Sequence, residues 1–154
     1  MKSFIFKGFL SLILCLCISP LAIADNATSV KQNIIKQAKA MGVEPAIVLS
    51  IAKTESGFNQ NVRSAGGHIG VFQLSVATAK RMGLNPYNLD ENIKGGITYY
   101  KNMYDKLGSM ELAVAAYNIG PDAIKRNNNV IPKYAQPFVS RIMTDYRYYK
   151  KNGL

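Results

Sequence analysis

Cysteine and histidine are almost absent from this chain of 154 residues, and tryptophan is missing altogether. The two cysteines, Cys15 and Cys17, lie near the N-terminus, so the rest of the chain has no thiol for a disulfide, a zinc site or a nucleophile. The single histidine, His68, excludes a histidine-rich metal site, and no Gly-x-Ser-x-Gly turn accompanies it to make a serine triad. We interpret His68 as a solvated loop residue. Glycine-rich phosphate-binding motifs are also missing, so we expect no metal and no cofactor.

Acidic side chains are scarce: nine Asp and Glu stand against 19 Lys and Arg, which gives a net charge of +10. Such a basic surface can attract nucleic acid, an anionic membrane or an acidic polymer such as a bacterial cell wall. The basic residues are scattered, and no helix-turn-helix, zinc-finger or RNA-binding motif accompanies them. We therefore expect no nucleic acid partner, and the cell wall is the best specific candidate.

The only long apolar run lies in the first 24 residues. Lys2 and Lys7 precede an apolar segment, and residues 22–24 are Ala-Ile-Ala, an A-x-A cleavage site. Residues 1–24 are therefore predicted to be a cleavable secretory signal peptide. The alternative, an uncleaved membrane anchor, would need about 20 apolar residues, more than this segment offers. We expect residues 25–154 to form one exported domain, periplasmic or secreted, monomeric and without stable membrane insertion.

Helical periodicity dominates the remainder of the chain and predicts a predominantly α-helical single domain. The expected helices span roughly residues 30–41, 45–56, 75–82, 90–107, 110–117, 121–126 and 138–149. Residues 57–74 contain four glycines and little alternation, so we expect a long functional loop there, which can include a short hairpin. Ser75, Asp90 and Ser109 are expected to cap the starts of the helices that follow them.

Glu55 is the leading catalytic candidate. Counting back three, four and seven residues along its helix gives Ala52, Ile51 and Val48, so the acid projects from the apolar face. Burial disfavours the charged carboxylate, and the negative end of the helix dipole disfavours it again. Such an acid stays protonated near neutral pH and can donate its proton to a leaving oxygen. The alternative is that Glu55 turns outward at a frayed helix end.

Hydrolysis of glycosidic bonds normally uses two carboxyl groups. The candidates for a second one are Asp90, Glu91, Asp105 and Glu111. Asp90 and Glu111 lie at helix starts, where an acid stabilises the helix end. Nothing in the sequence marks any of the four as a partner for Glu55.

Five segments stand out by their order and spacing. They are Glu55–Gly57, Ser64–Leu74 followed by Ala77–Ala79, Asn92–Tyr100, Ala115–Pro121 with its Ala-Tyr-Asn, and Phe138–Ile142. Together they resemble the catalytic domain of the soluble lytic transglycosylases. One such motif alone has little specificity, whereas five in register, from Ala27 to Tyr146, cover nearly the whole chain beyond the signal peptide.

The resemblance implies a lysozyme-like fold, mainly α with a small β element, and cleavage of the β-1,4 bond between N-acetylmuramic acid and N-acetylglucosamine in peptidoglycan. In that family one glutamic acid, here Glu55, protonates the leaving oxygen and then deprotonates the muramic 6-hydroxyl, so the product is a 1,6-anhydro sugar. The positions that bind sugar or acetamido groups around the acid are matched by Ser64, Gln73, Tyr117 and Asn118.

Tyr117 and Ser56 also have a basis in their positions. Tyr117 ends an alanine-rich helix, where its hydroxyl could donate to a buried carboxylate or an acetamido oxygen, and core packing is the alternative. Ser56, next to the acid, is expected to support the helix end. The usual Gly-Leu-Met-Gln of the family is here Gly-Val-Phe-Gln at residues 70–73, and His68 replaces a usual small residue. These departures concern subsite preference and leave the acid in place.

Two other functions stay open. One is a muramidase that uses water, with Asp90 or Glu91 folding over the cleft. The other is a non-catalytic protein that binds the wall through its positive charge. By family analogy, small enzymes of this kind often open local gaps for a secretion, conjugation or pilus machine, so such an envelope-spanning machine is an expected partner.

Overall fold

The computed structural model describes residues 20–154, with side chains from Asn26 onward. Its elements are α1 (Pro20–Ala40), α2 (Pro45–Ser56), β1 (His68–Ile69), β2 (Leu74–Ser75), α3 (Val76–Arg81), α4 (Leu89–Leu107), α5 (Met110–Ile119), α6 (Pro121–Arg126), the 3-10 helix η1 (Lys133–Ala135) and α7 (Gln136–Asn152). The predicted mainly helical fold is confirmed, and the loop after α2 does contain a short hairpin.

The predicted signal peptide lies outside the described residues, apart from its last part, Pro20–Ala24, which begins α1. The first helix thus starts ten residues earlier than the apolar pattern from Val30 indicated. Within the described segment, none of the helices combines the length and apolarity that a membrane span requires.

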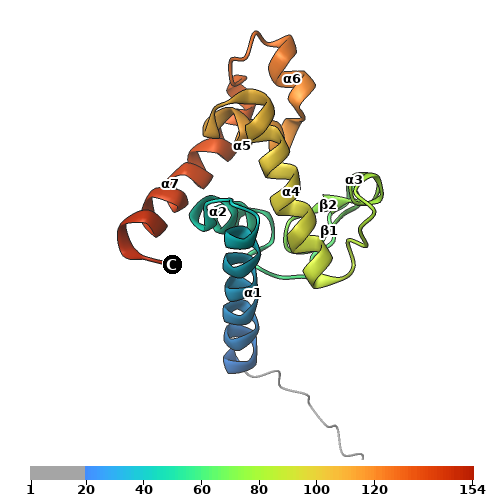
Figure 1. Ribbon diagram of the computed structural model, residues 1–154, viewed down its shortest axis with the longest axis vertical. Coiled ribbons are helices and arrows are strands. Elements are labelled where there is room, and N and C mark those ends of the chain that lie inside the picture. The colour runs from blue at the N-terminus through green and yellow to red at the C-terminus, as the bar shows by residue number, and fades with distance from the viewer. Residues whose placement is uncertain (1–19) are drawn as a thin grey trace, which may run out of the picture.

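α2 is the central helix of the domain. Its residues Ala46–Ala52 are all buried, because α1, α4 and α7 pack against it (Figure 1). Pro45 occupies the first turn, and Gly57 ends the helix in the left-handed conformation with φ of 61°, as predicted. Because the core holds α2 on several sides, the position of Glu55 in its last turn is well defined.

The starts of the later helices follow local side-chain caps. Ser75 and Ser109 cap α3 and α5 as predicted, each accepting a hydrogen bond from a backbone N–H three residues on. The helix α4 is present as predicted, but its predicted cap, Asp90, was wrong. Its cap is Asn88, whose Oδ1 accepts from the backbone N of Glu91 at 3.1 Å, and Asp90 lies one residue inside the helix. An acid there still interacts favourably with the helix dipole.

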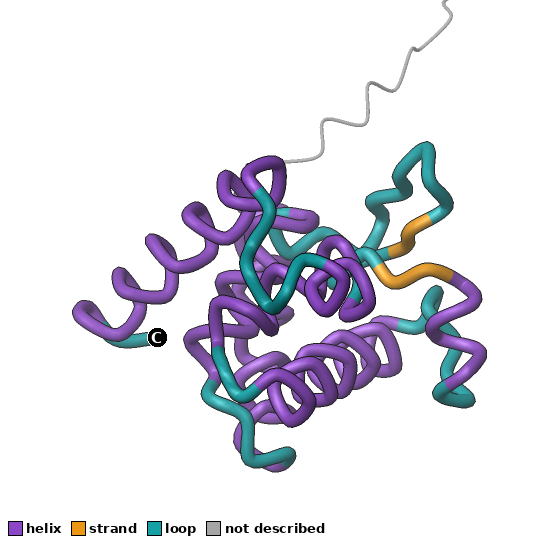
Figure 2. Tube along the Cα trace, turned by 90° about the horizontal axis from the view of Figure 1, so that it is seen from above, coloured by secondary structure: helices purple, strands orange, loops and turns teal. Residues whose placement is uncertain are grey.

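The segment between α2 and α3 docks on α4. Strands β1 and β2 pair antiparallel, with His68 opposite Ser75. The fully buried Asn92 of α4 holds the loop that joins them, because its Oδ1 accepts from the Phe72 N–H at 2.9 Å and its Nδ2 donates to the Ile69 carbonyl at 2.8 Å. Figure 1 places this hairpin and α3 on the side of α2 away from α7, and in Figure 2 the two strands lie on the opposite side of the domain from the C-terminal helix.

Glycine makes this docking possible. The buried Phe72 ring lies against Gly96 of α4, where an added Cβ would collide with the ring. Without a side chain at Gly96, the loop approaches α4 closely enough for Asn92 to reach its backbone. The hairpin is therefore held at a fixed distance from the end of α2.

Candidate active site

Glu55 is half-buried in the last turn of α2, on the face that the helical spacing predicted. Burial raises the pKa of its carboxyl from 4.5 to about 7. Within the described part of the chain, no positive side chain opposes this effect of desolvation. Near neutral pH a large part of the Glu55 population therefore carries a proton, which is the state a general acid needs.

All the residues expected at the site come together around this acid. A cavity of about 210 Å³ is lined by Glu55, Ser64, His68, Gln73, Tyr117 and Asn118. A second hollow of about 120 Å³ shares His68, Gln73, Tyr117 and Asn118 with it and extends to Ser75, Thr78 and Tyr99. We call the two together the cleft. One wall comes from the hairpin and α3, and the other from α4 and α5.

His68 was missed as a site residue. It is exposed, as expected, but it lies on β1 and not in a loop, and it borders both hollows of the cleft. Its backbone N–H donates to the Ser64 hydroxyl at 3.0 Å, and its Nδ1 lies 3.3 Å from the same oxygen. The sequence signal that could have revealed this role was its replacement of a small residue in the motif.

Gln73 is held in a strained conformation. Its φ is +46°, in the left-handed region that residues other than glycine rarely adopt. Its Nε2 donates to the carbonyls of Gly70 at 2.9 Å and Val62 at 3.3 Å. Among the described residues no donor contacts its side-chain oxygen, so this oxygen is left to accept from a ligand in the cleft. Strain of this kind at a cleft is typical of functional positions.

Tyr117 joins the two walls of the cleft. Its hydroxyl donates to the Phe72 carbonyl at 2.7 Å. The carboxylate that the sequence suggested as an acceptor is therefore not its partner. Its ring packs edge-on against Tyr99, with 5.2 Å between the ring centroids. Burial raises the pKa of Tyr117, and the nearby Glu55 raises it further. Tyr117 therefore stays neutral and fixes the hairpin relative to α5.

A family model of the transglycosylase SLT domain matches residues 32–135, more than half of the chain. The chain belongs to the SLT transglycosylase domain family. This confirms the resemblance read from the sequence. The matched residues include four of the five motifs, among them those with Glu55 and Tyr117, and Phe138–Ile142 lies beyond them.

Two known proteins similar to this SLT domain are longer than it. It is 35% identical over 79 residues to a transglycosylase of Enterobacteria phage PRD1, covering 51% of this chain and 30% of that protein. It is 36% identical over 92 residues to the membrane-bound lytic murein transglycosylase F of Shewanella pealeana, covering 53% of this chain and 19% of that protein. The chain thus spans less than a third of the length of these relatives.

The fold of the SLT domain also matches solved structures. With a TM-score of 0.69 and 23% identity, it is similar to an inactive mutant of the lytic transglycosylase Slt of Pseudomonas aeruginosa, over 79% of this chain and 24% of that one. The 70 kDa soluble lytic transglycosylase of Escherichia coli gives the same TM-score and identity over 86% of this chain and 24% of that one. The predicted fold family is therefore confirmed.

The candidates for a second carboxylate in the SLT domain all lie outside the cleft. Asp90 accepts from the Asn33 amide at 2.6 Å, and Glu91 accepts from the backbone N of Asn85 at 2.7 Å. Asp105 forms an ion pair with Lys101 at 2.8 Å, and Glu111 accepts from the Ser109 hydroxyl at 3.3 Å. Across the described part of the chain, no three His, Cys, Asp or Glu side chains group as a metal site would require.

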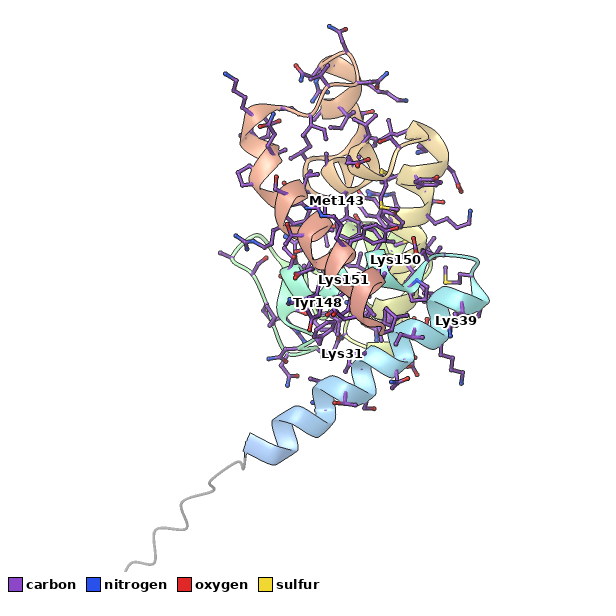
Figure 3. All side chains as sticks on the ribbon, turned by 90° about the vertical axis from the view of Figure 1, so that its left-hand side faces the viewer. Lys31, Lys39, Met143, Tyr148, Lys150 and Lys151 are labelled. Carbon is purple, nitrogen blue, oxygen red and sulfur yellow. The ribbon has the colours of Figure 1, made fainter. Side chains whose placement is uncertain are left out.

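Larger hollows lie at the other end of α2. One of about 250 Å³ is bordered by Glu44, Tyr100 and Tyr104, and one of about 290 Å³ by Lys39, Glu44, Lys150 and Leu154. Lys39 and Lys150 are visible on this side of the SLT domain in Figure 3. Glu44 borders both of these hollows, and its carboxylate already accepts from the Tyr146 hydroxyl at 2.9 Å and from Lys150 at 2.5 Å. Burial acts to raise the pKa of Glu44, but the hydrogen bonds and the charge of Lys150 together outweigh it and lower the pKa, so Glu44 does not suit a general acid.

Ser56 links Glu55 to the hairpin. Its hydroxyl donates to the Val71 carbonyl at 2.8 Å and accepts from the Asn59 N–H at 3.2 Å. The expected support of the helix end is thus present, and it reaches the loop that carries Gln73.

Replacing Ser56 by alanine is expected to lower the free energy of unfolding by about 1 kcal/mol, the usual net value of one such hydrogen bond. Thermal or urea unfolding would measure it. Ser140→Ala is the matched control, because Ser140 is exposed on α7 and its hydroxyl bonds to nothing among the described residues. Equal effects of the two substitutions would contradict a special role for Ser56.

Proposed function

We propose that this SLT domain is a peptidoglycan lytic transglycosylase with Glu55 as both acid and base. The observation that carries the proposal is that Glu55 is the only carboxyl group lining the cleft among the described residues, and that it has a raised pKa of about 7. One acid that exchanges its proton readily near neutral pH suits a reaction that needs an acid first and a base second.

In the proposed reaction the protonated Glu55 donates to the glycosidic oxygen that joins N-acetylmuramic acid to N-acetylglucosamine. The bond between this oxygen and the anomeric carbon breaks, and the acetamido group of the substrate stabilises the cationic carbon. The Glu55 carboxylate then takes the proton of the muramic 6-hydroxyl, whose oxygen attacks the anomeric carbon. This closes a 1,6-anhydro ring, returns the proton to Glu55 and consumes no water.

The roles of the neighbouring residues follow from the hydrogen-bonding groups that are not already engaged within the protein. Gln73 offers its side-chain oxygen to an acetamido N–H, because its amide hydrogens are already bound to backbone carbonyls. Asn118 is exposed at the end of α5 and can donate or accept on the opposite wall. Ser64 borders the same cavity. We propose that these three bind the sugars on either side of the scissile bond.

The hydrolytic alternative has less support. A muramidase would need Asp90 or Glu91 to fold over the cleft, yet both carboxylates hold other parts of the chain in hydrogen bonds of 2.6–2.7 Å. A water-activating base would also be expected near Glu55. The cleft offers His68, which is engaged with Ser64, and no second acid among the described residues.

Digestion of purified sacculi, followed by mass spectrometry of the products, tests the proposal. Muropeptides that end in an anhydro sugar, lighter by one water than hydrolysis products, are expected. Products that carry the water would identify a muramidase. Binding to sacculi without any soluble product would identify a non-catalytic wall-binding protein.

We further infer that the protein acts outside the cytoplasmic membrane. The predicted signal peptide of residues 1–24 would export it to the compartment that contains peptidoglycan. The named membrane-bound murein transglycosylase of Shewanella pealeana supports an envelope location. A partner machine that spans the envelope remains a proposal by family analogy.

A further inference from the structure

One wall of the cleft comes from a stretch of the chain without a single acidic residue. Between Glu55 and Asp90 there is no Asp or Glu, whereas Arg63, Lys80 and Arg81 all fall in this stretch. The hairpin and α3, which form that wall, belong to it. This stretch therefore carries positive charge with no acid of its own to neutralise it. Of its three basic residues, Arg81 is the one that bonds to a residue lining the cleft, Thr78.

Thr78 of α3 is arranged as a hydrogen-bond donor to this part of the cleft. It lines the hollow beside Ser75 and Tyr99. Its hydroxyl oxygen accepts from the Ser75 hydroxyl at 2.9 Å and from Arg81 Nη2 at 3.1 Å. Because a hydroxyl oxygen has two acceptor positions and one hydrogen, both acceptor positions are filled and the hydrogen is left for a ligand.

Arg81 brings a positive charge to the same place. Its contact with Thr78 uses one of the five N–H donors of its guanidinium group. Burial raises the pKa of Tyr99, which lines the hollow, and the charge of Arg81 opposes this rise. An arginine with free N–H groups beside a hydroxyl donor is a typical carboxylate-binding arrangement.

We propose that Arg81 and Thr78 form a subsite for a carboxylate of the peptide stem carried by the muramoyl residue. This inference rests on the proposed function, because it takes peptidoglycan as the substrate. The N-acetylated sugars of a glycan strand carry no charge of their own, so the carboxylates of a stem-bearing strand lie in its peptides. A strand that passes through the cleft would place a stem beside the acid-free wall, and His68, at the junction of the two hollows, adds a further polar contact.

Binding measurements on two matched ligands test the subsite. The first is a soluble muropeptide with free stem carboxylates, and the second is the same molecule with these groups converted to carboxamides. The proteins carry Glu55→Gln so that turnover does not consume the ligand. Arg81→Gln in this background is expected to weaken binding of the carboxylate ligand about tenfold, the scale of one charge-assisted hydrogen bond, and to leave the carboxamide ligand unchanged. Arg81→Lys should keep much of the affinity, because it keeps the charge.

Arg147→Gln is the matched control. Arg147 donates to the Thr144 hydroxyl at 3.3 Å, the same spacing of three residues as Arg81 and Thr78, but on α7, which contributes no residue to the cleft. Its replacement should change neither affinity. Equal affinity of the unaltered site for both ligands, or an equal loss for both with Arg81→Gln, would overturn the subsite. If the parent protein makes no anhydro product and the carboxylate preference persists, the proposed function fails and the subsite stands.

Discussion

Replacing Glu55 by glutamine is expected to reduce the rate of sacculus digestion by at least about 10³-fold. General acid–base catalysis by one group typically contributes 10²–10⁴-fold, and in the proposed mechanism the same carboxyl serves in both proton transfers. Glutamine has nearly the same size and can neither give up nor take a proton at these pH values. The release of soluble muropeptides per minute, followed by chromatography, measures the loss.

Two controls make this result specific. Asp90→Asn removes a carboxylate that lies outside the cleft and bonds to Asn33, so it should leave the rate within a few-fold of the wild type. The Glu55→Gln protein should still bind sacculi, since it keeps the cleft and its positive charge. Substantial lytic activity in the Glu55→Gln protein would contradict the proposed mechanism.

Stability is expected to depend on pH through the same carboxyl group. Folding raises the pKa of Glu55 from 4.5 to about 7, so the folded protein holds this proton more tightly than the unfolded chain does. Below pH 4.5 both states are protonated and the group has no effect. As pH rises from 4.5 to 7 the unfolded chain loses the proton first and folding weakens. Above pH 7 the loss is complete, and the difference in pKa corresponds to roughly 3 kcal/mol as an upper value.

Urea unfolding of the wild type and of Glu55→Gln, each at pH 4.5 and pH 8, measures this effect. The variant should gain about 2–3 kcal/mol relative to the wild type between the two pH values, because glutamine does not ionise. Other titrating groups are common to both proteins and cancel. Glu111→Gln, an exchange at an exposed glutamate outside the cleft, should show no such gain. Parallel stability curves for wild type and Glu55→Gln would contradict a buried, proton-holding Glu55.

Such a result would mean that the active site weakens the fold at physiological pH. A carboxyl buried without a positive partner stabilises neither the helix end nor the core, which is consistent with the catalytic role proposed for it. The strained φ of Gln73, on the facing loop, is a second feature of the candidate site that costs stability.

Local patterns predicted most of the helical framework correctly. The ends of α2 follow from Pro45 and Gly57, and the starts of α3 and α5 follow from Ser75 and Ser109, because caps depend on residues close in sequence. The cap of α4 was misassigned because Asn88 and Asp90 are both good capping residues, and the sequence offers no local signal to choose between them.

Contacts between distant segments were beyond such reasoning. The partner of the Tyr117 hydroxyl is the Phe72 carbonyl, 45 residues away in the chain, and only the docked hairpin brings the two together. The place of His68 in the cleft depends on the register of β1 with β2, which a loop with four glycines does not specify locally. The carboxylates of Asp90 and Glu91 likewise find their partners through the fold.

The amino-acid sequence by itself pointed to the candidate for the proposed chemistry. Both cysteines lie in the predicted signal peptide, there is a single histidine, and Glu55 lies on the apolar face of a well-capped helix, which made it a candidate. The resemblance of the five motifs to the lytic transglycosylases then favoured it over an acid that turns outward. Only the tertiary structure decided what surrounds that acid. The hairpin packs against α4 through Gly96 and Asn92, and this packing forms one wall of the cleft from a stretch of chain without acids. The other candidate carboxylates lie outside that cleft. These contacts join residues far apart in the sequence, so no local pattern predicts them.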